Sequence, residues 1–317
     1  GLYAGALAYE KIVYFAPAGE NNVGRLDTCT DEFSIIEIPL DGDYKYDGVL
    51  RVGHKMYMAP CNVNNVGILD LITEKFTYSV IPFFDEVINP DLKRAWGNLV
   101  VVGENMYLSP WGASVIAVLN MTSEMWSRIA FSEIPRTTYF QYWGAAAYDG
   151  TVYFLPSNTP SIMRLDTSSK QVSTIDISFT SDRKGLFDFH FAYTAQVGST
   201  IFMSPGVEME VGIFDMKTET FSTAPFGKTN ASEVSQWGAA VVKNSVYFGL
   251  FSSDNILQVR ADKDVSQLAT MRRLRRHRAS AGQEDDSPTW LQLSIDMEGE
   301  EGLKEDARSE VVQESEL

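Results

Sequence analysis

The sequence predicts an all-β protein built from six copies of one four-stranded unit, and three observations lead to this fold class. An aromatic residue within a β-rich run recurs at six positions, namely Tyr14, Tyr57, Tyr107, Tyr153, Phe202 and Tyr247. The end of the next strand follows at a constant offset of 13 residues, at Asp27, Asp70, Asn120, Asp166, Asp215 and Arg260. The repeats are spaced by 43 to 50 residues. Periods of about 40 to 50 residues with strand patterning are typical of β-propeller blades.

The fourth repeat shows the unit most clearly. A small apolar run suits an inner strand near a crowded axis, and Asp149-Gly150 after it is a hairpin signal. A β-rich second strand ends at Pro156, because proline cannot donate a ladder hydrogen bond. Third and fourth strands follow on either side of a polar turn that begins at Asp166. We expect strands at 144–148, 151–155, 162–165 and 172–177.

The same order recurs in the other repeats, so we expect a β-propeller over residues 1–270. One small sheet cannot bury both of its faces, and stacking the sheets around an axis creates the core. This architecture resembles that of kelch-type β-propellers, although the Gly-Gly pair of the kelch signature is absent. The resemblance implies a scaffold for binding. Whether residues upstream of Gly1 supply another blade or domain stays open.

Composition excludes several classes of function. The chain has 317 residues, a formal net charge of −16 and 44% hydrophobic residues. Nucleic acid is excluded as a partner because phosphate contacts need clustered Lys and Arg. No run approaches the roughly 18 consecutive apolar residues of a membrane span. We therefore expect a soluble, monomeric propeller that uses no cofactor.

The two cysteines fall in turns on opposite faces of the predicted disc. Cys29 lies between the third and fourth strands of its blade, and Cys61 follows a second strand. A disulfide needs Cα atoms within about 7 Å, so we expect two free thiols. Free thiols agree with a reducing compartment, and we expect a cytoplasmic protein.

The composition changes after the sixth repeat. Residues 271–317 begin with a basic run from Arg272 to Arg278 and continue as a polar, acidic segment. Such a segment buries too little apolar surface to offset chain entropy, so we expect a disordered tail. The basic run leaves open a nuclear localisation signal or a solvated segment.

The predicted recognition surface is the propeller face that carries the between-blade loops and the loops from second to third strands. These loops contain aromatic and arginine residues, the types that dominate protein-binding hot spots. The repeated tryptophans before glycine also fit packing between blades. The binding candidates are Arg94, Trp96, Arg136, Tyr139, Phe140, Trp143, Arg183, Phe187 and Trp237.

Signals for catalysis are sparse. Of the three histidines, His277 falls in the predicted tail, which leaves too few in the propeller for a multi-histidine metal site, so we expect no metal. The nearest acid/base group combines His190 with Asp188, Glu208 and Glu210 near the predicted mouth.

We therefore predict a non-catalytic binding or scaffold module for a protein or peptide. The alternatives are a propeller lyase or hydrolase with a site at the axial mouth, and a structural repeat within a larger protein.

Overall fold

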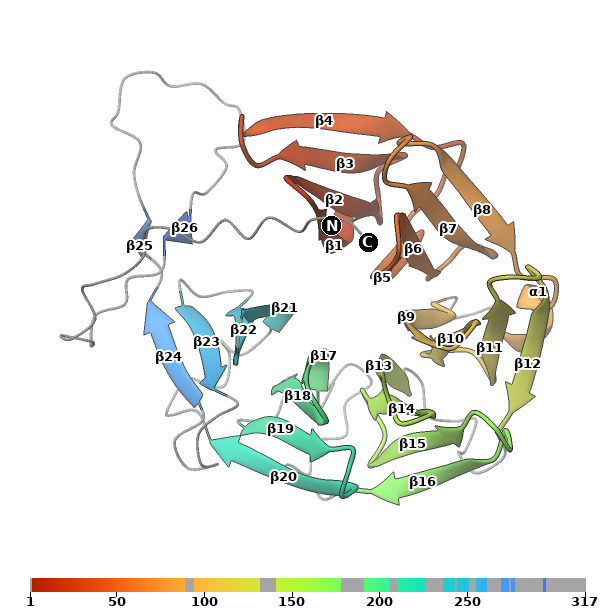
Figure 1. Cartoon of the computed structure of the whole chain (residues 1–317), viewed down its shortest axis with the longest axis vertical. Coiled ribbons are helices and arrows are strands. Elements are labelled where there is room, and N and C mark those ends of the chain that lie inside the picture. Colours follow the sequence, from red (N-terminus) through yellow and green to blue (C-terminus); the bar gives the residue numbers. More distant parts are fainter. Residues whose placement is uncertain are drawn as a thin grey trace, which may run out of the picture.

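The computed structural model describes residues 2–88, 94–131, 141–177, 191–205, 210–225, 236–242, 244–250, 255–260, 269–273, 275–276 and 293–294. These residues form six four-stranded antiparallel sheets, which confirms the predicted fold class. Figure 1 shows the sheets as blades around a common axis, with the first strand of each blade innermost. None of the described helices has the length and apolar character of a membrane-spanning segment.

Each blade uses four consecutive strands in the order of the sequence. The first three blades are β1 (Tyr3–Tyr9), β2 (Ile12–Pro17), β3 (Asn22–Asp27), β4 (Glu32–Glu37); β5 (Tyr46–Val52), β6 (Lys55–Pro60), β7 (Asn65–Asp70), β8 (Phe76–Val80); and β9 (Trp96–Val102), β10 (Asn105–Pro110), β11 (Val115–Asn120), β12 (Trp126–Ala130). The last three are β13 (Tyr142–Tyr148), β14 (Thr151–Pro156), β15 (Ser161–Asp166), β16 (Val172–Asp176); β17 (Phe191–Val197), β18 (Thr200–Pro205), β19 (Glu210–Asp215), β20 (Thr220–Pro225); and β21 (Gln236–Val242), β22 (Ser245–Leu250), β23 (Asn255–Arg260), β24 (Ala269–Arg273).

Three short elements complete the description. The helix α1 (Phe84–Val87) lies in the connection between the second and third blades, where Phe84 packs against Trp96 in the core. The strands β25 (Arg275–Arg276) and β26 (Leu293–Ser294) pair with each other. The outer strand β24 extends to Arg273, so the sixth blade includes the first residues of the segment that we predicted as tail. Apart from β25 and β26, the remainder of that predicted disordered tail lies outside the described residues.

The turn between third and fourth strands is stabilised by the side chain that ends the third strand. In the fourth blade, Asp166 Oδ1 accepts hydrogen bonds from the backbone N–H groups of Ser168 (3.0 Å) and Ser169 (2.9 Å). These hydrogen bonds lower the pKa of Asp166 to about 2. Asp27, Asp70, Asn120 and Asp215 accept backbone N–H groups in the same way. The repeated acidic position therefore has a structural role.

Close approach between inner strands requires glycine at several positions of the ring, among them Gly97 and Gly144. A Cβ atom on Gly97 would lie 2.6 Å from the Trp143 side chain of the next blade, and one on Gly144 would lie 2.8 Å from Thr194. These distances are shorter than real Cβ contacts, so the missing side chain lets neighbouring inner strands pack directly. The register of the inner strand also shifts between Tyr142 and Gly144, which marks a β-bulge.

The hydrophobic core lies between the blades. We call the face that a blade turns toward the preceding blade its leading face, and the opposite face its trailing face. Five buried clusters occupy the five junctions between consecutive blades. At the first junction, Tyr14 and Val23 of one trailing face pack against Met56, Met58 and Leu69 of the next leading face. Each blade thus depends on its neighbours for burial of its faces.

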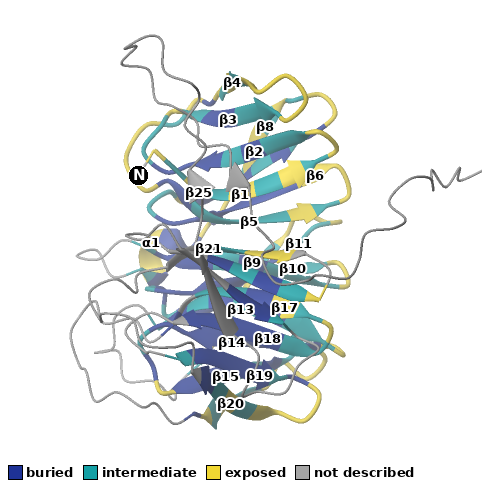
Figure 2. Ribbon diagram, turned by 90° about the vertical axis from the view of Figure 1, so that its left-hand side faces the viewer, coloured by how far each residue is buried: buried dark blue, intermediate teal, exposed yellow. Residues whose placement is uncertain are grey.

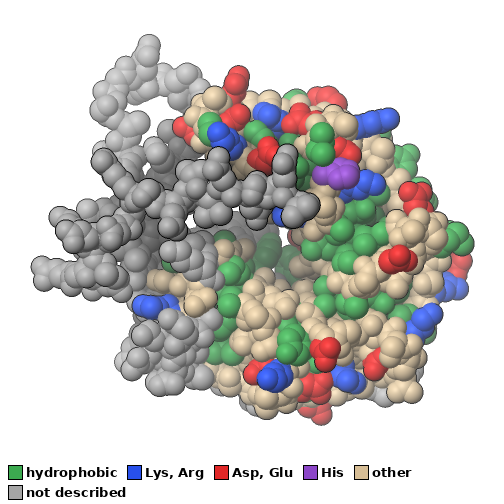
Figure 3. All heavy atoms as spheres, viewed as in Figure 1, with side chains coloured by type: hydrophobic (Ala, Val, Ile, Leu, Met, Phe, Trp, Pro, Cys, Tyr) green, Lys and Arg blue, Asp and Glu red, His purple; other side chains and the backbone are tan. Residues whose placement is uncertain are grey.

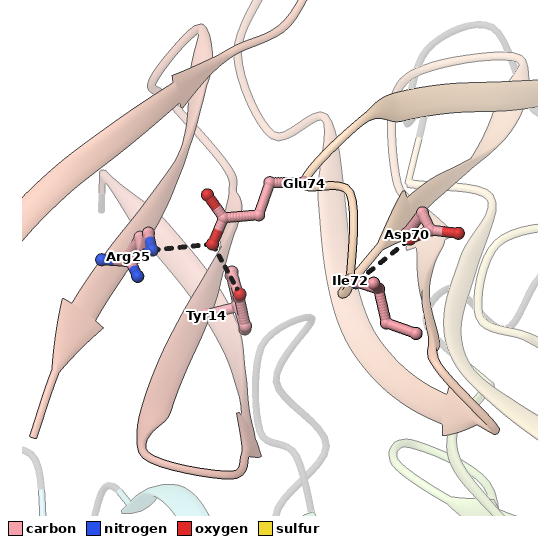
Figure 4. A network of polar contacts seen from close by, with 5 residues as sticks. All are labelled: Tyr14, Arg25, Asp70, Ile72 and Glu74. Carbon is pink, nitrogen blue, oxygen red and sulfur yellow. Dashed lines mark hydrogen bonds and ion pairs between the residues drawn. The ribbon is translucent and has the colours of Figure 1, made fainter.

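Polar contacts also join consecutive blades. The hydroxyl of Tyr14 and the Nε of Arg25 both donate to Glu74 Oε1 in the next blade, at 2.9 and 2.8 Å (Figure 4). Burial and the Glu74 carboxylate raise the pKa of Tyr14 to about 12. Tyr153, Arg164 and Glu219 repeat this arrangement between the fourth and fifth blades.

We expect Glu74→Ala to lower the free energy of unfolding by about 1–2 kcal/mol, because the buried Tyr14 hydroxyl loses its acceptor. Glu74 is partly exposed, so solvent screening limits the share of the ion pair with Arg25. Urea denaturation measures the change. Glu86→Ala, which breaks an ion pair at the exposed rim, is the matched control and should cost less than about 0.5 kcal/mol. Equal effects of the two substitutions would contradict a specific role for the junction contact.

Candidate functional site

The mouth of the propeller is the candidate site, because several blades place large side chains together there. We define the mouth cluster as Tyr44, Asp47, Cys61, Arg94, Trp111, Trp143 and Tyr193. Its members come from inner strands, from connections between blades and from residues that follow second strands. The second to fifth blades all contribute.

Arg94 is held at the junction of the second and third blades. Its backbone has φ of 34°, in the left-handed region, and its N–H donates to Asn62 Oδ1 at 2.9 Å. The guanidinium carbon lies 4.8 Å from the ring centre of Tyr44 and 5.2 Å from that of Trp111. Both distances fall in the range of cation–π contacts. The arginine therefore lies between two aromatic rings from different blades.

The aromatic surface continues from Trp111 across two further blades. The rings of Trp111 and Trp143 stack with their centres 4.7 Å apart, and the ring of Tyr193 lies 5.2 Å from that of Trp143. Trp111 is buried, whereas Trp143 and Tyr193 are half-buried. The half-buried rings give the mouth an apolar surface that a ligand can contact.

Asp47 adds an ionisable group at the start of β5. Burial raises the pKa of this carboxyl to about 7, and the Arg94 guanidinium partly offsets the rise. Burial, together with the Asp47 charge, raises the pKa of the Cys61 thiol and of the Tyr193 hydroxyl. Asp47 thus interacts electrostatically with three members of the cluster and changes charge near neutral pH.

Two of the predicted binding residues, Arg94 and Trp143, lie in the mouth cluster. Trp96 does not: it is fully buried, and its indole N–H donates to the Val115 carbonyl at 3.4 Å. This tryptophan fills the junction between the second and third blades and cannot touch a surface ligand. Trp237 belongs to β21, but its side chain lies outside the described residues, as do Arg136, Tyr139, Phe140, Arg183 and Phe187.

The predicted acid/base group falls mostly on residues that the structure does not describe. Asp188, His190 and Glu208 lie outside the described residues, and Glu210 is the half-buried first residue of β19. His54 is the one histidine within the described part, and it lies 3.4 Å from Asp70 at an exposed hairpin. Among the described residues, no group of three His, Cys, Asp or Glu side chains has a geometry that could hold a metal ion.

The prediction from sequence missed Tyr44, Asp47, Trp111 and Tyr193. A signal existed for two of them. Asp47 occupies the repeat position at which the fourth blade has Trp143, so a charge replaces an aromatic residue in register. Trp111 directly follows Pro110, the end of a second strand, and is therefore placed at the mouth.

Comparison with known proteins supports the fold. No family model and no curated protein matches the chain. Among solved structures, a streptogramin B lyase matches with a TM-score of 0.67 and 14% identity, over 87% of this chain and 84% of that chain. Virginiamycin B lyase from Staphylococcus aureus matches with a TM-score of 0.62 and 11% identity, over 85% of this chain and 83% of that chain.

An extracellular domain of a one-component system from B. thetaiotaomicron is also similar. It matches with a TM-score of 0.60 and 13% identity, over 86% of this chain but only 37% of that longer chain. At these identities the likeness shows the β-propeller fold and leaves the function open. The kelch-type resemblance remains one of architecture.

We expect one of the two cysteines to react rapidly with Ellman's reagent in the native protein. Cys29 is exposed, whereas Cys61 is buried with a raised thiol pKa, and neither forms a disulfide. The absorbance of the released thiolate product gives the number of reactive thiols, and Cys29→Ser should remove the fast reaction. Two fast thiols in the folded protein would contradict the buried position of Cys61.

We also expect Asp47 to reduce stability as the pH rises. The folded carboxyl keeps its proton up to about pH 7, whereas the unfolded one loses it near pH 4, so the folded state binds more protons between these values. Stability from this group is full below about pH 4 and is lost as the pH rises through about 7. Asp47→Asn should therefore gain on the order of 2 kcal/mol over wild type between about pH 5 and about pH 8 in denaturation experiments. If the stabilities of wild type and Asp47→Asn changed with pH in parallel, Asp47 would be ionised throughout this range.

Proposed function

We propose that this propeller is a binding module that recognises a protein or peptide segment through the mouth cluster. The observation that carries the proposal is the continuous surface in which Arg94 contacts Tyr44 and Trp111, and Trp111 stacks on Trp143. Tryptophan, tyrosine and arginine are the residues most enriched at binding hot spots. A rigid ring of blades holds these side chains at fixed positions, which reduces the entropy cost of binding.

The cluster favours a particular kind of ligand. The half-buried rings of Trp143 and Tyr193 offer apolar and aromatic contacts, and Arg94 offers N–H donors to a carbonyl or carboxylate. Asp47 accepts or donates a hydrogen bond according to its protonation near pH 7. An extended peptide that inserts an apolar or aromatic side chain and presents backbone carbonyls satisfies all three groups.

A second candidate is an enzyme with its site at the same mouth. Asp47 favours it, because general acid/base catalysis works best with a pKa near the operating pH. Two of the structures with a similar fold are a streptogramin B lyase and a virginiamycin B lyase, which adds an analogy of fold only. This candidate predicts turnover that Asp47→Asn abolishes, whereas the binding module tolerates that substitution better than loss of its aromatic surface.

The test is selection of linear peptides from a random phage-displayed library on the wild-type protein. The selected peptides, made synthetically, should lose at least about tenfold in affinity, or about 1.4 kcal/mol, for the double variant Arg94→Ala, Trp143→Ala. Arg128→Ala, which removes an arginine over the ring of Phe83 at the rim, is the matched control and should bind as wild type does. Thermal unfolding verifies that the double variant is folded. Peptides that bind both proteins equally, or a library that yields none, would contradict the proposal.

A further inference from the structure

The leading face of the first blade differs from the other five leading faces in its exposure. Val13, Phe15 and Leu26 are only half-buried. The residues at the same repeat positions in the other blades are all at most 3% exposed: Met56, Met58, Leu69, Met106, Leu108, Leu119, Val152, Phe154, Leu165, Ile201, Met203, Phe214, Val246, Phe248 and Val259. The second strands show the contrast: β14 is buried along its whole length, whereas only Tyr14, Ala16 and Pro17 of β2 are buried (Figure 2).

The chemistry of this exposed face matches that of a face that is covered. Paired strands place the residues of the first blade in register with those of the fourth. Six positions of this face are identical in type: Tyr3 and Tyr142, Ala6 and Ala145, Ala8 and Ala147, Val13 and Val152, Phe15 and Phe154, Leu26 and Leu165. Two others differ, because Gly24 and Phe33 stand where the fourth blade has Met163 and Val172. The third blade covers the face of the fourth with Tyr107, Ile116 and Val118. A sheet with such a trailing face would meet the same side chains at these six positions of the first blade.

The arrangement of the ring places this face beside an opening. The inner strands of consecutive blades contact each other from β1 to β21, whereas β21 and β1 are not in comparable contact. Figure 1 shows the first and sixth blades apart from each other. On the other side of the opening, Tyr247 is half-buried, although the matching residues Tyr14, Tyr57, Tyr107, Tyr153 and Phe202 are at most 7% exposed. Both sides of the opening thus carry a half-formed junction.

A backbone contact is also repeated at the junctions. The N–H before an inner strand donates to a carbonyl of the preceding blade: Ala95 to Cys61 at 2.7 Å and Gln141 to Trp111 at 2.8 Å. Leu2 occupies this position in the first blade, and the residue is exposed. An incoming blade would supply the acceptor for the Leu2 N–H in the same way.

We propose that the opening between the sixth and first blades takes one further four-stranded blade of this repeat, whose trailing face covers Val13, Phe15 and Leu26. A second copy of the chain fits less well. If the sixth blade of that copy covered this face, the fifth blade of the copy would occupy the place of the sixth blade here. The segment 277–317 contains one apolar run, at 290–295, in which Leu293–Ser294 pair with β25, and so it offers little apolar surface for positions on three adjacent strands. A large exposed apolar face on a sheet marks an interaction surface.

The test compares thiol labelling at two matched positions in a Cys29→Ser background. Val13→Cys reports the exposed face, and Val152→Cys reports the same position under the third blade. In the 317-residue chain, we expect maleimide to label Val13→Cys at least ~100-fold faster than Val152→Cys, because only the latter needs local unfolding. Slow labelling of Val13→Cys would overturn the proposal. If deletion of 277–317 then made the labelling fast, the tail would be the occupant. If dilution made it fast, a second copy would be the occupant.

The second arm supplies a further blade. A duplicate of residues 94–140, the third repeat, is placed directly before Leu2, since its trailing face covers the identical residues of the fourth blade. Labelling of Val13→Cys should slow to the rate of Val152→Cys, and the thermal midpoint should rise. The same insertion with Tyr107→Asp and Val118→Asp in the duplicate is the matched control and should leave Val13→Cys reactive. If the intact duplicate also leaves it reactive, the face does not take a blade.

Discussion

Burial between blades is the interaction on which the rest of this structure depends. A four-stranded sheet has two faces and no core of its own, so each blade becomes stable only when neighbouring blades cover it. The five hydrophobic clusters lie at the five described junctions, and the Tyr–Arg–Glu contacts add polar links between the same neighbours. A face that no neighbouring blade covers stays only half-buried, as the leading face of the first blade shows.

The same packing places chemistry at the mouth. Inner strands approach one another closely where Gly97 and Gly144 meet the next blade, and the strand starts converge on the axis. Side chains from four blades, which are far apart in the sequence, then meet in one cluster. Figure 3 shows the opposite face of the disc, on which charged side chains lie mostly toward the rim and hydrophobic ones gather nearer the centre.

The junctions also explain why aromatic residues in this protein have two different roles. Trp96 and Phe84 fill the space between the second and third blades and are withdrawn from any ligand. Trp143 lies one residue beyond the corresponding position of the fourth blade and turns toward Trp111 and Tyr193 at the mouth. A shift of one residue along a strand reverses the face that a side chain occupies, so tryptophans in similar sequence contexts lie in the core or at the mouth.

The sequence by itself determined the repeat, the four strands of each blade and the turn role of residues such as Asp70 and Asp166, because strand alternation, hairpin residues and side-chain caps act over a few residues. Only the tertiary structure decided that Trp96 is buried, that Asp47 lies near Arg94, Cys61 and Tyr193, and that one leading face is uncovered. The reason is physical: burial, desolvation and ring stacking depend on the positions of whole blades around the axis, and local sequence patterns carry no information about that arrangement.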